Sequence, residues 1–378
     1  MAREIPVPIT PSVLKWAMDE AGYEPVSLAA ELSLDADLVD RWLDGREKPS
    51  LGKFRQFASL LRRPTATFLL PAPPGEPRPA VAFRHAPGEL DRELLPIEHR
   101  RIREVTRLQR IASWLVDQLR EKVSPLPQTT TSADPENVGK QIRAILDISI
   151  GMQLSWKGEG AALQAWRSAL ERIGVLVFLL PLGKESARGF SLFSDSAPAI
   201  AVNTAWNTTA RIFTMLHELG HLVTRTNSIC AEVGAGSSGT PDGGLERWCE
   251  KTAAAALMPR DSIAGALSGW GNPDPSIQTA SKVAVAFRVS LRAAALRMVS
   301  LGHADWGLYA AVKAATDGKG TARGGTGRTR PKIRIDEYGR RTTRLVLEGI
   351  DREIIGPAEA MGFLDVSYRN LDQLREMI

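Results

Sequence analysis

The segment His217-Glu218-Leu-Gly-His221 constrains this chain more than any other stretch of its sequence. Histidines four residues apart fall on one face of a helix, so both rings can reach a single metal ion. The alternative is a pair of surface histidines on an amphipathic helix. Apolar residues around the pair favour a packed helix and therefore a metal centre; they are Phe213, Leu216, Leu219 and Leu222.

Glu218 lies one position after His217, where its carboxylate can hydrogen-bond a water molecule without binding the metal itself. Zinc polarises such a water strongly, and a neighbouring carboxylate can accept its proton and hand it later to a leaving amine. This arrangement predicts a zinc-dependent peptidase with Glu218 as its catalytic base.

A catalytic zinc needs a third protein ligand and one open position. No histidine follows His221 closely, because the only later one is His303. A glutamate on a following helix is the remaining common arrangement, and Glu246 opens a predicted helix at about 244–257. Glu232 is a competing ligand, but it lies in a glycine-rich loop that would hold it less firmly.

The predicted helix that carries Glu246 has two further features. Glu250 lies one turn further on the same face, where it could accept the second ring N–H of a zinc histidine and fix its tautomer. Alanines at positions 253–256 would let this helix pack closely against the histidine helix.

Composition excludes several other classes of protein. The 378 residues are 43% hydrophobic and 24% charged, as in an average soluble protein, and exceed one ordinary domain. The two cysteines are too few for a disulfide framework or a four-thiolate zinc site. The start of the chain lacks the pattern of a secretory signal, and no apolar run approaches a membrane span. We therefore expect a cytoplasmic protein with no membrane partner.

Residues 1–75 are predicted to form a small helical bundle. Ser27 is predicted to cap a short helix, a second helix runs from Asp35 to Leu43, and Ser50 caps another. Two helices joined by a short turn inside a bundle follow the helix-turn-helix plan. The proline-rich stretch at 69–79 cannot continue a helix and marks a boundary.

The presumed recognition helix of this bundle begins with the acidic residues Asp35, Asp37 and Asp40, which repel a DNA duplex. Basic side chains nearby could contact phosphates; they are Arg41, Arg46 and Lys48. The net charge of +5 suits an acidic partner such as nucleic acid without requiring one. DNA binding and protein docking are therefore both open for residues 1–75.

The remainder is divided at composition changes. Residues 76–130 are predicted as a proline-rich linker and helical connector, whose arginines form a solvated face. Residues 131–315 are predicted as an α+β core, with strands first and helices after. Its expected elements are a helix at 161–173, strands at 175–180, 189–193 and 199–203, and helices at about 207–224, 244–257 and 276–301. Residues 316–378 are predicted as a flexible basic linker, to about 334, and a small helical appendix.

An extended peptide substrate can bind as an added strand along an exposed sheet edge. The stretch just before the metal helix is the best candidate for that edge, and an ordinary core strand is the alternative. The candidate substrate-binding residues are Ala199, Ile200, Val202 and Asn203.

The sequence resembles the ImmA/IrrE family of metallopeptidases, in the form fused to an N-terminal XRE-type helix-turn-helix. The matching stretches are Gly189-Phe-Ser, Pro198-Ala-Ile-Ala-Val-Asn203, Phe213-Thr-Met-Leu-His-Glu-Leu-Gly-His-Leu, Glu246-Arg-Trp-Cys-Glu, Trp42-Leu-Asp-Gly-Arg-Glu-Lys-Pro and Phe68-Leu-Leu-Pro. The chain departs from the family at Glu250, where Asn or Asp is usual.

The resemblance implies a gluzincin-like fold after an N-terminal all-α bundle, with zinc bound by His217, His221 and Glu246 and with Glu218 as general base. It also implies a specific protein substrate, typically a transcriptional repressor or antitoxin, cleaved in a stress or mobile-element response. Manganese in place of zinc stays open. The second hypothesis is a DNA-binding transcriptional regulator whose peptidase-like domain acts as a sensor.

Overall fold

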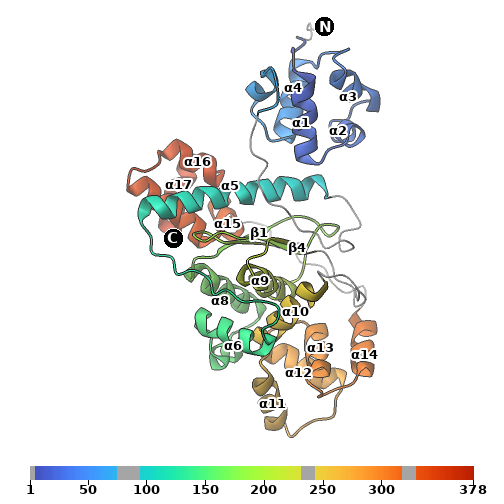
Figure 1. Cartoon of the computed structure of the whole chain (residues 1–378), viewed down its shortest axis with the longest axis vertical. Coiled ribbons are helices and arrows are strands. Elements are labelled where there is room, and N and C mark those ends of the chain that lie inside the picture. Colours follow the sequence, from blue (N-terminus) through green and yellow to red (C-terminus); the bar gives the residue numbers. More distant parts are fainter. Residues whose placement is uncertain (1–4, 75–93, 231–242, 317–328) are drawn as a thin grey trace. The chain divides into compact units, whose positions relative to one another are not determined.

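The computed structural model describes residues 5–74, 94–230, 243–316 and 329–378 (Figure 1). The chain divides into two compact units, here called unit 1 and unit 2. Unit 1 comprises Met1–Ala80 with Arg92–Arg103, and unit 2 comprises Val81–Asp91 with Glu104–Ile378. Each unit is built around its own apolar core.

Unit 1 is a helical bundle with an aromatic core. Trp42, Phe57 and Phe68 are at most 2% exposed, and Phe57 meets Phe68 edge-on with ring centroids 5.1 Å apart. Its elements are α1 (Pro11–Ala21), α2 (Pro25–Glu31), α3 (Ala36–Leu43), α4 (Leu51–Leu60), the 3₁₀ helix η1 (Thr65–Leu69) and the start of α5 (Pro96–Leu119).

The predicted helix starts in unit 1 are right at two places and wrong at one. Asp35 precedes α3, and Ser50 caps α4 by accepting a 3.5 Å hydrogen bond from the Lys53 amide. Ser27 is not a cap, because α2 begins at Pro25, whose fixed φ suits the first helical position. The Ser27 hydroxyl instead donates to the Glu24 carbonyl, 2.8 Å away.

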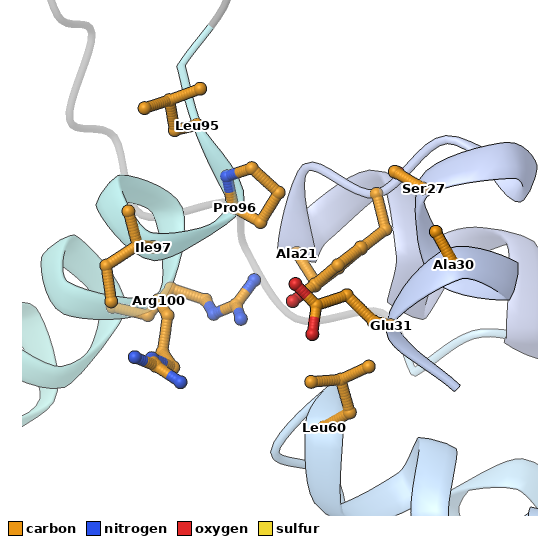
Figure 2. A pocket seen from close by; sticks show the side chains of 11 residues that line it. Ala21, Ser27, Ala30, Glu31, Leu60, Leu95, Pro96, Ile97 and Arg100 are labelled. Atoms are coloured by element: carbon orange, nitrogen blue, oxygen red, sulfur yellow. The ribbon is translucent and has the colours of Figure 1, made fainter. Parts of the chain in front are cut away.

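A cavity of about 840 Å³ lies in unit 1 between its helical bundle and the start of α5 (Figure 2). Arg100 and Glu31 face one another across it from α5 and α2. Arg103 also lines it and donates a hydrogen bond to the Glu20 carbonyl. Burial, together with the charge of Arg63, lowers the pKa of Arg103 to about 10. The prediction of a solvated arginine face is therefore wrong for Arg103.

Unit 2 contains a 4-stranded sheet in the order β1-β3-β2-β4. Its strands are β1 (Leu176–Leu180), β2 (Gly189–Leu192), β3 (Ala199–Asn203) and β4 (Ser228–Cys230). β3 runs parallel to β1 and antiparallel to β2, and β4 runs antiparallel to β2. Every residue of β1, β2 and β3 is buried, as expected for strands with both faces covered.

Helices cover the sheet and extend beyond it (Figure 1). α9 contacts β2 and β3, and α15 contacts β1. The helices of unit 2 after α5 are α6 (Pro135–Leu146), α7 (Ile150–Ser155), α8 (Glu159–Arg172), α9 (Thr208–Val223), α10 (Gly243–Leu257), α11 (Arg260–Gly269), α12 (Ile277–Phe287), α13 (Leu291–Ser300), α14 (Trp306–Thr316), α15 (Arg330–Asp351), α16 (Pro357–Leu364) and α17 (Tyr368–Met377). The predicted α+β class is confirmed.

The helix predicted over 276–301 is two helices. Arg288 ends α12 in the left-handed conformation, with φ at 56°. Ser290 then caps α13 by accepting a hydrogen bond from the Ala293 amide at 3.1 Å. A serine cap inside a helical pattern indicates a new start, which apolar spacing alone does not reveal.

The C-terminal helices belong to unit 2, and two of their arginines, Arg334 and Arg341, are buried. α15 begins at Arg330, within the stretch predicted as linker, and residues 317–328 lie outside the described part. Arg341 is 4% exposed, and its Nη1 lies 2.8 Å from the Glu121 carboxylate. Tyr338 packs on Phe178 of β1 with ring centroids 6.2 Å apart. The prediction that these arginines are solvated is therefore wrong for Arg341.

None of the helices in the described ranges combines the length and the apolar character needed to cross a lipid bilayer.

Candidate metal centre

The helix α9 carries the paired histidines and is fixed at its start by a side-chain cap. The Asn207 Oδ1 accepts a 2.9 Å hydrogen bond from the Ala210 amide, which satisfies a donor that the first turn leaves free. Ile212, Met215 and Leu216 are fully buried in the core of unit 2. α9 is thus the packed helix that the sequence predicts.

α10 approaches α9 closely, and a glycine permits it. A Cβ on Gly220 would lie 3.0 Å from the Sγ of Cys249, closer than side chains normally pack. Two of the α10 alanines also lie against α6, where a Cβ on Gly139 would meet Ala255 and Ala256 at 2.8–2.9 Å. The tightest contact with the histidine helix is the one between Gly220 and Cys249.

The close approach brings three predicted ligands together. Nε2 of His217 lies 3.0 Å from the Glu246 carboxylate, and Nε2 of His221 lies 3.1 Å from its other oxygen. The two ring nitrogens are 3.2 Å apart. Among the described residues, these three side chains form a group whose ligand atoms all lie within 4.8 Å of one another, close enough to hold one metal ion.

The donor set fits a zinc ion. Ligand bonds of about 2.0–2.1 Å in a tetrahedral site give a separation of roughly 3.3 Å between donor atoms. The 3.0–3.2 Å separations among His217, His221 and Glu246 are close to that value. Two imidazoles and one carboxylate leave one of four positions open, the composition typical of catalytic rather than structural zinc.

Mutual hydrogen bonding stabilises the charges of this cluster. Burial alone would raise the pKa of Glu246, but its hydrogen bonds with His217 and His221 outweigh burial and hold that pKa well below its usual range. Burial alone would lower the pKa of His217, but the same carboxylate raises it. The cluster is therefore a preformed, charge-complementary site rather than three separate buried groups.

Glu218 is fully buried beside the cluster, and its two carboxylate oxygens differ in environment. Oε2 accepts a 2.6 Å hydrogen bond from the Ser228 hydroxyl of β4. The Ser228 Oγ in turn lies 3.1 Å from the Ser191 Oγ on β2. No donor among the described residues reaches Oε1. Oε2 is thus fixed by a hydrogen bond, whereas Oε1 is available to accept a proton.

The ring of His221 has a hydroxyl contact that sequence reasoning missed. Thr226 Oγ1 lies 3.3 Å from Nδ1 of His221. Neither Thr226 nor Ser228 stands out in the sequence, because hydroxyl residues are common and their spacing from the histidines has no helical period once α9 has ended at Val223.

Glu250 lies one turn beyond Glu246 on α10, as predicted. Burial raises the pKa of Glu250, and its charge acts on His217. Its role in fixing a histidine tautomer stays a prediction. The Nδ1 atom of His221 is contacted by the Thr226 hydroxyl.

The predicted substrate edge is wrong. β3, which holds Ala199, Ile200, Val202 and Asn203, lies between β1 and β2 and pairs with both. Its backbone groups are therefore already committed to neighbouring strands and cannot receive a peptide. The Asn203 side chain instead donates to the carbonyls of Gly183 and Ala187 at 2.6 and 3.0 Å.

The other candidate residues lie elsewhere. Glu232, the competing ligand, falls outside the described residues. In unit 1, Arg41 pairs with Glu47 at 2.8 Å and Arg46 pairs with Asp44, while Lys48 is exposed. Two of the three predicted phosphate contacts are thus occupied by carboxylates of the same loop.

Residues 170–299 match a family model described as the IrrE N-terminal-like domain of Peptidase_M78. The matched range runs from the end of α8 to the end of α13 and includes all four strands, α9 and α10. No curated protein matches the chain. The match indicates a protease-like domain of the ImmA/IrrE type, and the candidate ligands lie within it.

Proposed function

We propose that this chain is a zinc-dependent endopeptidase of the gluzincin type. The observation that carries the proposal is the convergence of His217, His221 and Glu246 on one point, with Glu218 buried beside them. Zinc is proposed over manganese because imidazole donors suit zinc, whereas manganese prefers oxygen ligands.

Each side chain has a definite part in this proposal. When bound, zinc would polarise a water molecule and the scissile carbonyl. Glu218 takes the proton of the attacking water on Oε1, which no described donor engages, and passes it to the leaving amine. The open fourth position of the donor set gives the substrate access to the ion.

We propose a specific regulatory protein as the substrate, either a transcriptional repressor or an antitoxin, cleaved in the cytoplasm during a stress or mobile-element response. The support is the match to the IrrE N-terminal-like domain and the resemblance of residues 1–75 to an XRE-type bundle. The test is cleavage of the product of the neighbouring gene, with and without a chelator. Failure of any chelator-sensitive cleavage would contradict this substrate class.

The metal assignment is tested by zinc content in purified wild type, His217→Ala and Glu218→Gln. We expect His217→Ala to lose zinc because it removes a ligand. We expect Glu218→Gln to keep zinc but lose cleavage, because it removes the proton acceptor and leaves the ligands intact. Full zinc stoichiometry in His217→Ala would overturn the ligand set.

The alternative is a DNA-binding regulator whose peptidase-like domain is a sensor. The short connection between α2 and α3 supports a helix-turn-helix in unit 1. The pairing of Arg41 with Glu47 and of Arg46 with Asp44 reduces the positive charge offered to phosphates. Sequence-selective DNA binding by the full chain that survives at 200 mM salt would support the alternative.

A further inference from the structure

The turn that follows α9 places a hydroxyl on the far side of a ligand ring. Thr226 Oγ1 lies 3.3 Å from Nδ1 of His221. Nε2 of the same ring faces the Glu246 carboxylate at 3.1 Å and the His217 ring at 3.2 Å. One ring nitrogen therefore faces the ligand cluster, and the other faces Thr226.

The position of Thr226 is fixed by bonds back to the helix. Its backbone amide donates to the His221 carbonyl at 2.9 Å, and its hydroxyl lies 3.0 Å from the same oxygen. Arg225 enables the reversal because it adopts the left-handed conformation, with φ at 61°. Its guanidinium packs over the Phe193 ring at 4.5 Å and donates to the Leu126 carbonyl at 3.1 Å.

The hydroxyl has two oxygen partners besides the ring. Thr226 Oγ1 lies 3.0 Å from the His221 carbonyl, which only accepts, and 3.1 Å from Thr224 Oγ1. With its single proton on the carbonyl, its lone pairs remain for an N–H donor. Nδ1 of His221 is that donor when the ring carries its proton there.

Metal binding requires this tautomer. A neutral imidazole has one proton, and a ring that binds through Nε2 must carry it on Nδ1. His221 is 1% exposed, so an Nδ1–H without an acceptor would be buried away from water. Partners of this kind raise the metal affinity of the ligand they hold.

We propose that Thr226 is a positioning residue of the metal centre: it accepts the Nδ1–H of His221 and so holds Nε2 ready for the metal. This inference rests on the proposed function, since it assumes that His221 binds zinc.

The experiment is a zinc affinity measurement, by competition with a chromophoric chelator, on the full chain. Thr226→Val keeps the shape of the side chain but removes the hydroxyl, and we expect zinc to bind about 10- to 100-fold more weakly. Thr226→Ser keeps the hydroxyl and should stay within about threefold of wild type. Thr226→Ala replaces the valine variant if valine prevents folding.

A control is Thr209→Val, at the start of the same helix. Thr209 Oγ1 donates to Asn207 Oδ1 at 3.0 Å, so this variant also removes a threonine hydroxyl from α9. Thr209 lies at the opposite end of α9 from His221, so the loss of zinc affinity should be much smaller than in Thr226→Val.

The tautomer itself provides a second readout. With ¹⁵N-labelled histidine, the long-range ¹H–¹⁵N spectrum of the zinc-loaded wild type should show His221 protonated on Nδ1. Equal zinc affinity in wild type and Thr226→Val, or a loss that Thr226→Ser shares, would overturn the inference while leaving the zinc site intact. A wild-type chain without zinc affinity at His217 and His221 would overturn the proposed function as well.

Discussion

At the scale of single residues, the site depends on how the carboxylate of Glu218 is held. A buried carboxylate with one free oxygen can rotate unless its other oxygen is fixed. Ser228 supplies that fixed bond at 2.6 Å, and Ser191 on the neighbouring strand supports Ser228 at 3.1 Å. The two serines are register partners across β2 and β4, so the sheet itself aligns the base.

The first prediction concerns Ser228→Ala. Because Ser228 donates to Glu218, which is not a metal ligand, we expect the variant to bind zinc as tightly as wild type. We expect its cleavage rate to fall by roughly tenfold, a fraction of the 10²- to 10⁴-fold that a general base contributes. The measurement is kcat on the cleaved regulatory protein, together with zinc content.

Ser228→Thr is the control for this prediction, because it keeps the hydroxyl and should recover most of the rate. A Ser228→Ala enzyme with an unchanged kcat would show that the serine does not orient Glu218.

The residues differ in how far sequence could predict them. His217 and His221 were predictable because their convergence follows from helix geometry alone. Glu246 needed an argument from zinc chemistry, since its helix begins only at Gly243, well beyond the end of α9 at Val223. Thr226 and Ser228 were not predictable, because their contacts depend on a reversal at Arg225 and on strand pairing.

At the scale of elements, the ligand cluster depends on the spacing between α9 and α10. Gly220 sits opposite Cys249, and an added Cβ would lie 3.0 Å from Sγ and 3.2 Å from the cysteine Cβ. The cysteine is buried and acts here as packing, with burial raising the pKa of its thiol well above the ordinary value. Any increase in this spacing moves Glu246 relative to the two imidazoles.

The second prediction is that Gly220→Ala weakens zinc binding by about tenfold, a size typical of changes to groups around metal ligands. Overpacking of this kind also costs about 1–3 kcal/mol of stability. Zinc affinity and chemical denaturation measure the two effects.

Adding Cys249→Ala removes the closest atom and should restore part of the zinc affinity. Cys249→Ala alone should keep zinc, since the cysteine is not one of the converging ligands. If the double variant lost as much zinc affinity as the two single variants together, the spacing between α9 and α10 would not explain the effect of Gly220→Ala.

A second glycine, Gly339, allows α15 to pack against the sheet. α15 is kinked at Gly339, whose φ of 86° and ψ of 160° are accessible almost only to glycine. A Cβ there would collide with the Glu171 carboxylate and lie 3.0 Å from the Val177 carbonyl. The Glu171 carboxylate that lies at this kink pairs with Arg167, whose Nε is 3.4 Å from Oε1.

The third prediction is that Gly339→Ala destabilises the protein by about 3 kcal/mol or more, from backbone strain and the collision together. Gly160→Ala in α8 is the matched control, because a Cβ there meets no atom within 4 Å. It should be neutral or stabilise by up to about 1 kcal/mol. Urea unfolding of both variants measures the difference, and equal stabilities would contradict the role of the kink.

The elements were predictable where the pattern is local. β1, β2, β3, α9 and α10 lie close to their predicted positions because apolar spacing and caps are written in adjacent residues. The order of the strands was not predictable in this way. The position of β3 just before α9 suggests an edge strand. Its pairing with both β1 and β2 depends on segments that are distant in sequence, so the local pattern does not show it.

At the scale of the whole molecule, the chain divides into two compact units, and the described residues give each unit an apolar core of its own. The core of unit 1 includes Trp42, Phe57 and Phe68, and the core of unit 2 includes Trp166, Met215 and Phe287. The candidate ligands all belong to unit 2. Any ligand that binds only the folded form stabilises the unit that binds it, by mass action.

The last prediction follows from this separation. Calorimetry of the full chain should show two unfolding transitions, one for each core, because independent cores unfold independently. Zinc at 100 times its Kd should stabilise unit 2 by about 2.7 kcal/mol. For a unit of this size, that amounts to a rise of several degrees in its transition temperature. The transition of unit 1 should not move.

The chelated protein should remain folded, because Glu246 pairs with both histidines without a metal. In His217→Ala the zinc-dependent rise should be absent, and a shift of both transitions in wild type would show that the units do not unfold separately.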